Sequence, residues 1–303
     1  AVAGVHCSAL SDAFSLAALD ANGAPLDSRS WQALEGPDHC LPGCADDAYA
    51  RFARHAALIE GAWSHRFDGP PEPAVQAALD EVIDALDSGA LRVATQRAVG
   101  RWQVHGWLLY AAILSLAART SRVLHAGDLR YIDQPGKFHD LDDATLLSRH
   151  WRVMPPTTVR RGCHLGRSVV LMPSYLSIGV HIGDGAMIDG FANIGSCAQI
   201  GRRVHISTCV GIGGVAEPFQ PRPVIIEDDC FIGANSSVVE GVIVEEGAVI
   251  GMGVHLGQST RIFDRETGRT SHGRIPAGAV VVPGTLPAAD GSQSVVCTTM
   301  SHS

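Results

Sequence analysis

The sequence predicts a mainly β protein: a left-handed parallel β-helix of hexapeptide repeats, preceded by an N-terminal α-helical domain. Two observations carry this prediction. Aliphatic residues recur at every sixth position from residue 170 to residue 212, and again from residue 226 to residue 256. Before residue 155, apolar residues instead recur at spacings of three and four, which is typical of amphipathic helices.

The period of six fits neither a helix nor an alternating strand, because a helix cannot bury one residue in six. Short strands joined by corners satisfy it, since three hexads form one triangular turn with the aliphatic side chain inside. The period is interrupted near residues 217–223 and 263–274, and such excursions of a repeat fold often build sites. A pure scaffold prism is the alternative. The residues expected to point inward are Val170, Leu176, Ile182, Ile188, Ile194, Ile200, Ile206, Ile212, Ile226, Ile232, Val238, Val244, Ile250 and Leu256, with Ile275 and Val281 after the second excursion.

Helices are predicted for residues 46–67 and 72–86, because their apolar residues line one side. Gly69-Pro70-Pro71 ends the first helix and Ser88-Gly89 the second. Residues 91–104 are expected to be extended, and residues 105–118 to form a buried apolar helix.

Four segments are therefore expected along the chain. They are an N-terminal extension of unknown role, the helical domain, the β-helix domain and a short C-terminal tail, at residues 1–45, 46–154, 155–288 and 289–303.

Composition argues against several classes of partner. The chain has 31 acidic and 23 basic residues, a net charge of −8, so nothing favours nucleic acid or an anionic membrane. Lys137 is the only lysine, so an anionic ligand must be held by arginine. The longest apolar run is too short to cross a bilayer, and the N-terminus lacks the features of a secretory signal. A cytoplasmic location is expected.

No metal site is expected. The eight cysteines are scattered, which favours free thiols over a disulfide framework. Cys40 and Cys44 lack the second pair that a zinc site needs. The cluster of Asp140, Asp142 and Asp143 fits helix capping better than metal binding.

Glycines and histidines of the repeat region are further candidate site residues. The glycine-rich run at residues 210–215 is not surrounded by a strand-to-helix unit, so its glycines are expected at corners and not around a phosphate. His181, His205 and His255 occupy the last position of their hexads and are expected to point outward. One of them is an alternative general base.

Several runs of the sequence resemble the tetrahydrodipicolinate N-succinyltransferase family. The resemblance extends from about residue 58 to residue 284, and its motifs belong to that family and not to hexapeptide acyltransferases in general. The runs that carry it are residues 86–93, 152–156, 171–175, 195–201, 210–218, 239–247, 257–262, 264–268 and 276–278.

The resemblance implies a homotrimer with active sites between neighbouring prisms. It also implies acyl transfer from succinyl-CoA or acetyl-CoA to the amine of a dicarboxylate, in lysine biosynthesis through diaminopimelate. Arg152 matches the family arginine that holds a substrate carboxylate, a task suited to a planar cationic fork. Asp189 matches the acidic active-site residue, and Phe191 stands where the family has tryptophan.

Three departures bear on the site. Ser237 replaces a family glutamate, and a serine cannot accept the amine proton at neutral pH. Asn235 stands where the family usually has arginine. The family also continues with a basic segment that helps to cover CoA, so phosphate contacts here are expected from Arg261, Arg265 or Arg274. These arginines are otherwise solvated hairpin charges.

The function predicted is a CoA-dependent N-acyltransferase that acts on tetrahydrodipicolinate or a related lysine-like amino dicarboxylate, a small molecule. The amine attacks the thioester directly, and backbone amides near Gly213 and Gly214 stabilise the oxyanion. The change at Ser237 favours a specialised branch, such as the tabtoxin-pathway relative. The alternative is a catalytically silent trimer that serves as a binding or regulatory partner.

Overall fold

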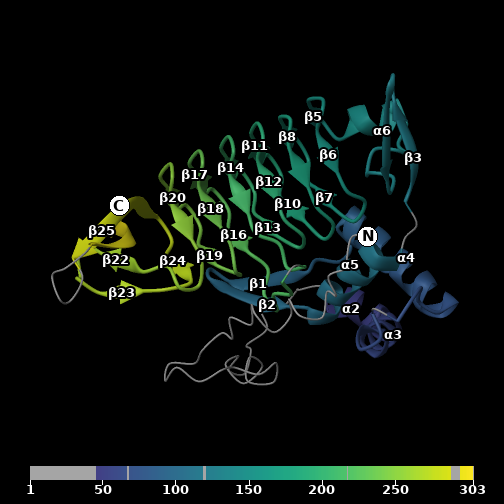
Figure 1. Cartoon of the computed structure of the whole chain (residues 1–303), viewed down its shortest axis with the longest axis horizontal. Coiled ribbons are helices and arrows are strands. Elements are labelled where there is room, and N and C mark those ends of the chain that lie inside the picture. Colours follow the sequence, from purple (N-terminus) through teal and green to yellow (C-terminus); the bar gives the residue numbers. More distant parts are fainter. Residues whose placement is uncertain (1–45, 67, 119–120, 217, 288–293, 303) are drawn as a thin grey trace, which may run out of the picture. The chain divides into compact units, whose positions relative to one another are not determined.

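A computed structural model describes residues 46–303 apart from residues 67, 119–120, 217, 288–293 and 303. The predicted N-terminal extension lies outside the described residues. The described elements are helices followed by a coil of short parallel strands that ends in a pair of longer strands (Figure 1).

The N-terminal helices follow the predicted pattern with one difference. The segment predicted as one helix forms two, α2 (Asp46–Arg51) and α3 (Ala53–Trp63), separated by a turn at Phe52. Helix α4 (Pro73–Ser88) begins with proline in its first turn and ends at Gly89, whose φ of 83° suits a residue without a side chain. Helix α5 (Gly106–Ala118) confirms the apolar helix.

Two antiparallel hairpins accompany these helices. Strands β1 (Ala94–Ala98) and β2 (Arg101–Val104) confirm the extended segment. Strands β3 (Arg122–Ala126) and β4 (Leu129–Asp133) form a second hairpin that the sequence analysis did not predict. Helix α6 (Asp143–Ser148) follows, and the Asp142 carboxylate accepts from the Thr145 amide at 2.8 Å. The capping interpretation of that acidic cluster is confirmed at Asp142.

The repeat region is the predicted left-handed β-helix, with three parallel sheets built from two-residue strands. We name each sheet by one residue. The His181 sheet contains β7 (His164–Leu165), β10 (His181–Ile182), β13 (Gln199–Ile200), β16 (Ile225–Ile226), β19 (Ile243–Val244) and β24 (Arg274–Ile275). The Arg152 sheet contains β5 (Arg152–Val153), β8 (Val170–Leu171), β11 (Met187–Ile188), β14 (His205–Ile206), β17 (Phe231–Ile232) and β20 (Val249–Ile250). The Ser237 sheet contains β6 (Thr158–Val159), β9 (Tyr175–Leu176), β12 (Asn193–Ile194), β15 (Gly211–Ile212), β18 (Ser237–Val238) and β21 (His255–Leu256).

The second residue of each of these strands points inward and, apart from half-buried Val153 of β5, is buried, so the sixfold periodicity is the core of the coil. One residue of the prediction is wrong. Val170 lies in register with Arg152 and Met187 and is only half-buried, whereas Leu171 fills the inward position. Leu171 and Leu176 are five residues apart instead of six. Counting six residues back from Leu176 therefore gives Val170 in place of the inward residue Leu171.

The C-terminal end of the coil carries longer strands. Strands β22 (Ile262–Asp264) and β23 (Thr270–Ser271) form a hairpin around the second excursion. Strand β25 (Ala279–Pro287) continues the Arg152 sheet and pairs antiparallel with β26 (Ser294–His302). The first excursion lies between β15 and β16.

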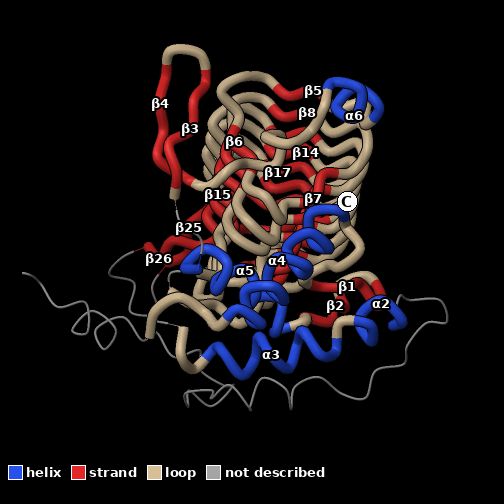
Figure 2. Tube along the Cα trace, turned by 90° about the vertical axis from the view of Figure 1, so that its right-hand side faces the viewer, coloured by secondary structure: helices blue, strands red, loops and turns tan. Residues whose placement is uncertain are grey.

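The helical region packs on the His181 sheet side of the coil. Ile178, Cys197 and Val215 from the coil's corners belong to the same apolar cluster as α3, α4 and α5. Figure 2, turned by 90° from Figure 1, shows these helices along one side of the strands, with the β3–β4 hairpin standing apart. Burial of each large aliphatic side chain in such a cluster contributes about 1.5–3 kcal/mol. In the described part of the chain, this apolar cluster contains no strand residue of the Arg152 or Ser237 sheet.

Candidate active site

Arg152 and Asp189 lie along the Arg152 sheet and the corner that follows it. Arg152 is the outward residue of β5 and is exposed. Asp189 follows β11, is half-buried, and its Oδ1 accepts from the amide of Gly190 at 2.6 Å. Strand β8 separates β5 from β11. With neighbouring strands ~4.8 Å apart, the two residues are about 10 Å apart along the coil.

Phe191 lies at the same corner as Asp189. Its backbone has a φ of 61°, and 77% of the residue is exposed. The strain of this left-handed conformation is offset by a hydrogen bond from its amide to the Pro173 carbonyl. An exposed phenyl ring on a fixed corner is available to contact a ligand or a second chain.

Ser237 lies on the Ser237 sheet, two strands beyond Asn193. Its Oγ lies 2.8 Å from Nδ1 of His255, the residue in register on the next strand. Gly211 is its neighbour on the other side and carries no side chain. The Gly213 amide donates to the Val238 carbonyl at 2.8 Å, so that amide is already used by the sheet. Among the described contacts the Gly214 amide has no acceptor.

The predicted residues do not converge within one chain. Ser237 is two strand spacings beyond Asp189 and on the next sheet, so the two are more than about 10 Å apart. Arg152 is two further spacings away in the opposite direction. No single substrate group can contact all three in one copy.

The three arginines near the C-terminal end differ in their surroundings. Arg261 and Arg265 are exposed beside strand β22. The Arg274 guanidinium instead donates to a Glu245 carboxylate oxygen at 2.6 Å and to the Gly100 carbonyl at 2.7 Å. Arg274 therefore ties the β1–β2 turn to the coil, and its charge is already paired.

The three histidines considered as alternative bases also differ. His181 is mostly covered by its surroundings and stacks on His164, and this partial burial lowers its pKa well below the usual range. His205 packs edge-on against Phe231 with ring centroids 5.2 Å apart. His255 is exposed. His255 is thus the one of the three that adjoins a predicted site residue.

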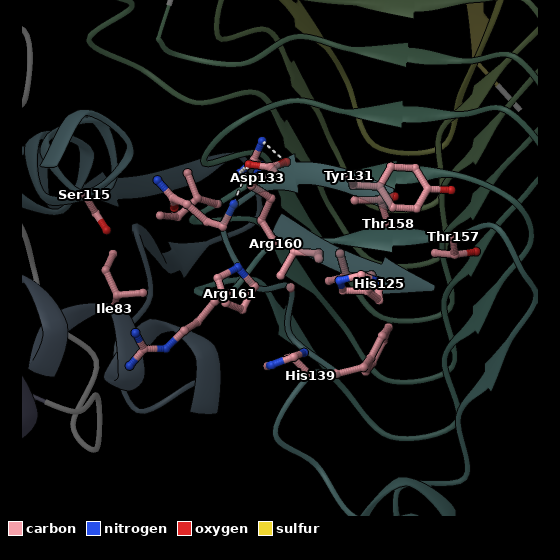
Figure 3. A pocket seen from close by; sticks show the side chains of 17 residues that line it. Ile83, Ser115, His125, Tyr131, Asp133, His139, Thr157, Thr158, Arg160 and Arg161 are labelled. Carbon is pink, nitrogen blue, oxygen red and sulfur yellow. Dashed lines mark hydrogen bonds and ion pairs between the residues drawn. The ribbon is translucent and has the colours of Figure 1, made fainter. Parts of the chain in front are cut away.

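A cavity of about 360 Å³ lies between the β3–β4 hairpin, the first turn of the coil and helices α4 and α5. Figure 3 shows Arg160 beside Asp133 in it, and their two contacts measure 2.9 and 3.0 Å. None of the predicted site residues lines this cavity. Within the described residues, no group of His, Cys, Asp or Glu is arranged to hold a metal ion, and none of the helices is long and apolar enough to cross a membrane.

Two family models match the chain. Residues 55–117 match the N-terminal domain of tetrahydrodipicolinate N-succinyltransferase, and residues 223–258 match the hexapeptide repeat of succinyl-transferase. The first covers the helical region and the second covers the coil around Ser237.

Proteins named 2,3,4,5-tetrahydropyridine-2,6-dicarboxylate N-succinyltransferase are similar over most of the chain. The one from Polynucleobacter asymbioticus is 49% identical over 244 residues, which are 79% of this chain and 89% of that protein. The one from Idiomarina loihiensis is 54% identical over 222 residues, or 73% of this chain and 81% of that protein. The one from Acinetobacter baylyi is 50% identical over 244 residues, with 79% and 89% covered.

Proposed function

This chain belongs to the tetrahydrodipicolinate N-succinyltransferase family, and from this premise we propose that it transfers the succinyl group of succinyl-CoA to the amine of tetrahydrodipicolinate or a closely related amino dicarboxylate. The observation that supports it most is about 50% identity over more than two thirds of both chains. Acetyl-CoA is the alternative donor. We also propose a cytoplasmic location, because acyl-CoA thioesters are made and kept inside cells.

The chemistry is a direct acyl transfer. Tetrahydrodipicolinate is a cyclic imine, so one water adds to its C=N bond and opens the ring to give the amine. The amine nitrogen attacks the thioester carbonyl, a carbon–nitrogen bond forms, the carbon–sulfur bond breaks, and CoA leaves as a thiolate that takes the proton from the amine. Arg152 holds a carboxylate with its planar fork. Asp189 orients the amine or accepts its proton, and the Gly214 amide stabilises the negative charge that develops on the thioester oxygen.

The functional unit is a homotrimer whose active sites lie between chains. Two features support this. The predicted residues of one copy are spread over four strand spacings. Large apolar residues are also exposed on the Arg152 sheet and its following corner, where a second copy would cover them. They are Phe191, Phe231, Val249 and Met252. Light scattering should then give three times the 31.9 kDa chain mass.

CoA is held at the C-terminal end of the coil. Arg261 and Arg265 are exposed there, and their guanidinium groups suit the phosphates of the cofactor. Arg274 is better assigned to the pair with Glu245.

The test is a thiol-release assay with succinyl-CoA and acetyl-CoA against tetrahydrodipicolinate and L-2-aminopimelate. We expect succinyl-CoA to be consumed only when an amino dicarboxylate is present, and to raise the melting temperature of the protein. A chain that consumes neither thioester and is not stabilised by either would be the catalytically silent homologue instead.

A further inference from the structure

A serine–histidine pair stands on the exposed face of the Ser237 sheet. Ser237 Oγ and His255 Nδ1 are 2.8 Å apart, and both residues are the outward members of neighbouring strands. Ladder hydrogen bonds flank the pair on both sides, from Ser237 N to Val254 O and from Val239 N to Leu256 O. The backbone therefore fixes the separation of the two side chains.

The turn after His255 is also held. The Thr260 hydroxyl donates to the His255 carbonyl at 3.3 Å and accepts from the Gly257 amide at 3.0 Å. The nearest charged residues along the chain are Glu240, whose carboxylate accepts from the Gln258 amide at 2.7 Å, and exposed Arg261. No described contact joins either of them to the imidazole.

Open space lies on the other side of Ser237. Its neighbour there is Gly211, and a Cβ at that position would lie only 3.9 Å from the Cβ of Ser237. Without that side chain, the sheet has a notch through which a ligand group can reach Ser237 Oγ. The hydroxyl thus has the imidazole on one side and free access on the other.

We propose that Ser237 and His255 form a proton relay that accepts the proton of the substrate amine. The hydroxyl donates to His255 Nδ1 at rest. As the amine nitrogen bonds to the thioester carbon, its proton passes to Ser237 Oγ, and the hydroxyl proton passes to Nδ1. The imidazolium that forms returns the proton to the CoA thiolate or to water. A serine alone has no such capacity at neutral pH, and a neutral imidazole does.

This inference rests on the proposed acyl transfer and adds to it. Ser237 contacts the amine, and His255 acts through Ser237 as its positioning and proton-accepting partner. Asp189, more than about 10 Å away in the same chain, cannot accept the same proton within one copy.

The test compares His255→Gln, Ser237→Ala and the double variant with the full-length wild type in the thiol-release assay. His255→Gln keeps a polar side chain of similar reach but cannot accept a proton. We expect kcat to fall about 100-fold in each single variant with KM little changed. The double variant should lose no more than either single one, because the two groups act as a unit.

Two further readouts separate a chemical role from a structural one. Free imidazole should restore part of the rate of His255→Ala, and the pH profile of kcat should differ between His255→Gln and the wild type. The matched control is His65→Gln, since His65 is exposed and paired with Asp68 at 3.0 Å but lies in the helical region. It should be unchanged.

Two outcomes would overturn the relay in different ways. The relay is rejected if the kcat of His255→Gln stays within about threefold of the wild-type value and imidazole does not raise the rate of His255→Ala. That result leaves the proposed acyltransferase activity intact. Absence of wild-type turnover with every amine and thioester rejects the acyltransferase and the relay together.

Discussion

The His181 sheet and the Ser237 sheet are built from the same repeat but face different surroundings. His181 and His255 occupy the same hexad position in the two sheets. The helical region covers the His181 sheet, where His181 stacks on His164 and burial lowers the pKa of both histidines. His255, on the Ser237 sheet, is exposed and hydrogen-bonded to Ser237. What covers a face of the coil therefore decides whether its outward residues serve stability or chemistry.

A substitution on the covered face should have the largest effect on stability of all those considered. The buried Glu227 carboxylate accepts from the Gly100 amide at 2.7 Å, the Trp102 indole at 2.6 Å and the Glu246 amide at 3.0 Å. Glu227→Ala leaves all three donors without this partner and should lower the free energy of unfolding by about 3–5 kcal/mol. Urea unfolding measures this. Exposed Glu246→Ala is the control, and a loss below about 1 kcal/mol for Glu227→Ala would contradict the assignment.

A substitution on the exposed face should instead have a large effect on the reaction rate and little effect on stability. Asp189→Asn removes a carboxylate that is half-buried at a corner. We expect kcat to fall about 100-fold, equivalent to about 2.7 kcal/mol, at an unchanged melting temperature. Near-normal turnover would contradict a role of Asp189 in orienting the amine.

A pH series tests the effect of the cover over the His181 sheet. Burial is the main cause of the lowered pKa of His164 and His181, with Lys137 and Arg92 adding to it. The unfolded chain therefore takes up protons below about pH 6.5 that the folded chain does not, so stability falls as the pH is lowered.

The expected slope is up to about 1.4 kcal/mol per pH unit for each buried histidine. Urea unfolding between pH 7.5 and 5.5 should show a shallower dependence of stability on pH for His181→Gln than for the wild type. Equal slopes in the variant and the wild type would mean that the cover over the His181 sheet does not protect its histidines.

The sequence predicted the coil well because its periodicity is a direct record of burial. The exception at Val170 arose where the coil is one residue shorter, which a fixed count of six cannot detect. The β3–β4 hairpin was missed, although Gly127-Asp128 between two runs containing β-branched and aromatic residues is a turn signal. The pairing of Ser237 with His255 was predictable from the sequence. The two residues are eighteen positions, or three hexads, apart, which is one turn of the coil and places them side by side on neighbouring strands.

Other features depend on contacts that periodicity does not encode. His181 and His255 look alike in the repeat, and only the packing of the helical region distinguishes them. Arg274 was considered for phosphate binding because it is a basic residue near the end of the coil, but its pairing with Glu245 and Gly100 depends on the fold of the β1–β2 turn. The convergence of Arg152, Asp189 and Ser237 was expected at an interface between chains, which one chain does not contain.

Complementation tests most directly whether the exposed sheets meet a second copy of the chain and share an active site with it. Asp189→Asn and Ser237→Ala are each expected to be nearly inactive alone. After denaturation and refolding of an equal mixture, random assortment in a symmetric oligomer should give roughly a quarter of the wild-type activity, because some interfaces combine an intact Asp189 with an intact Ser237. A mixture that remains as inactive as its two components would contradict a site shared between chains.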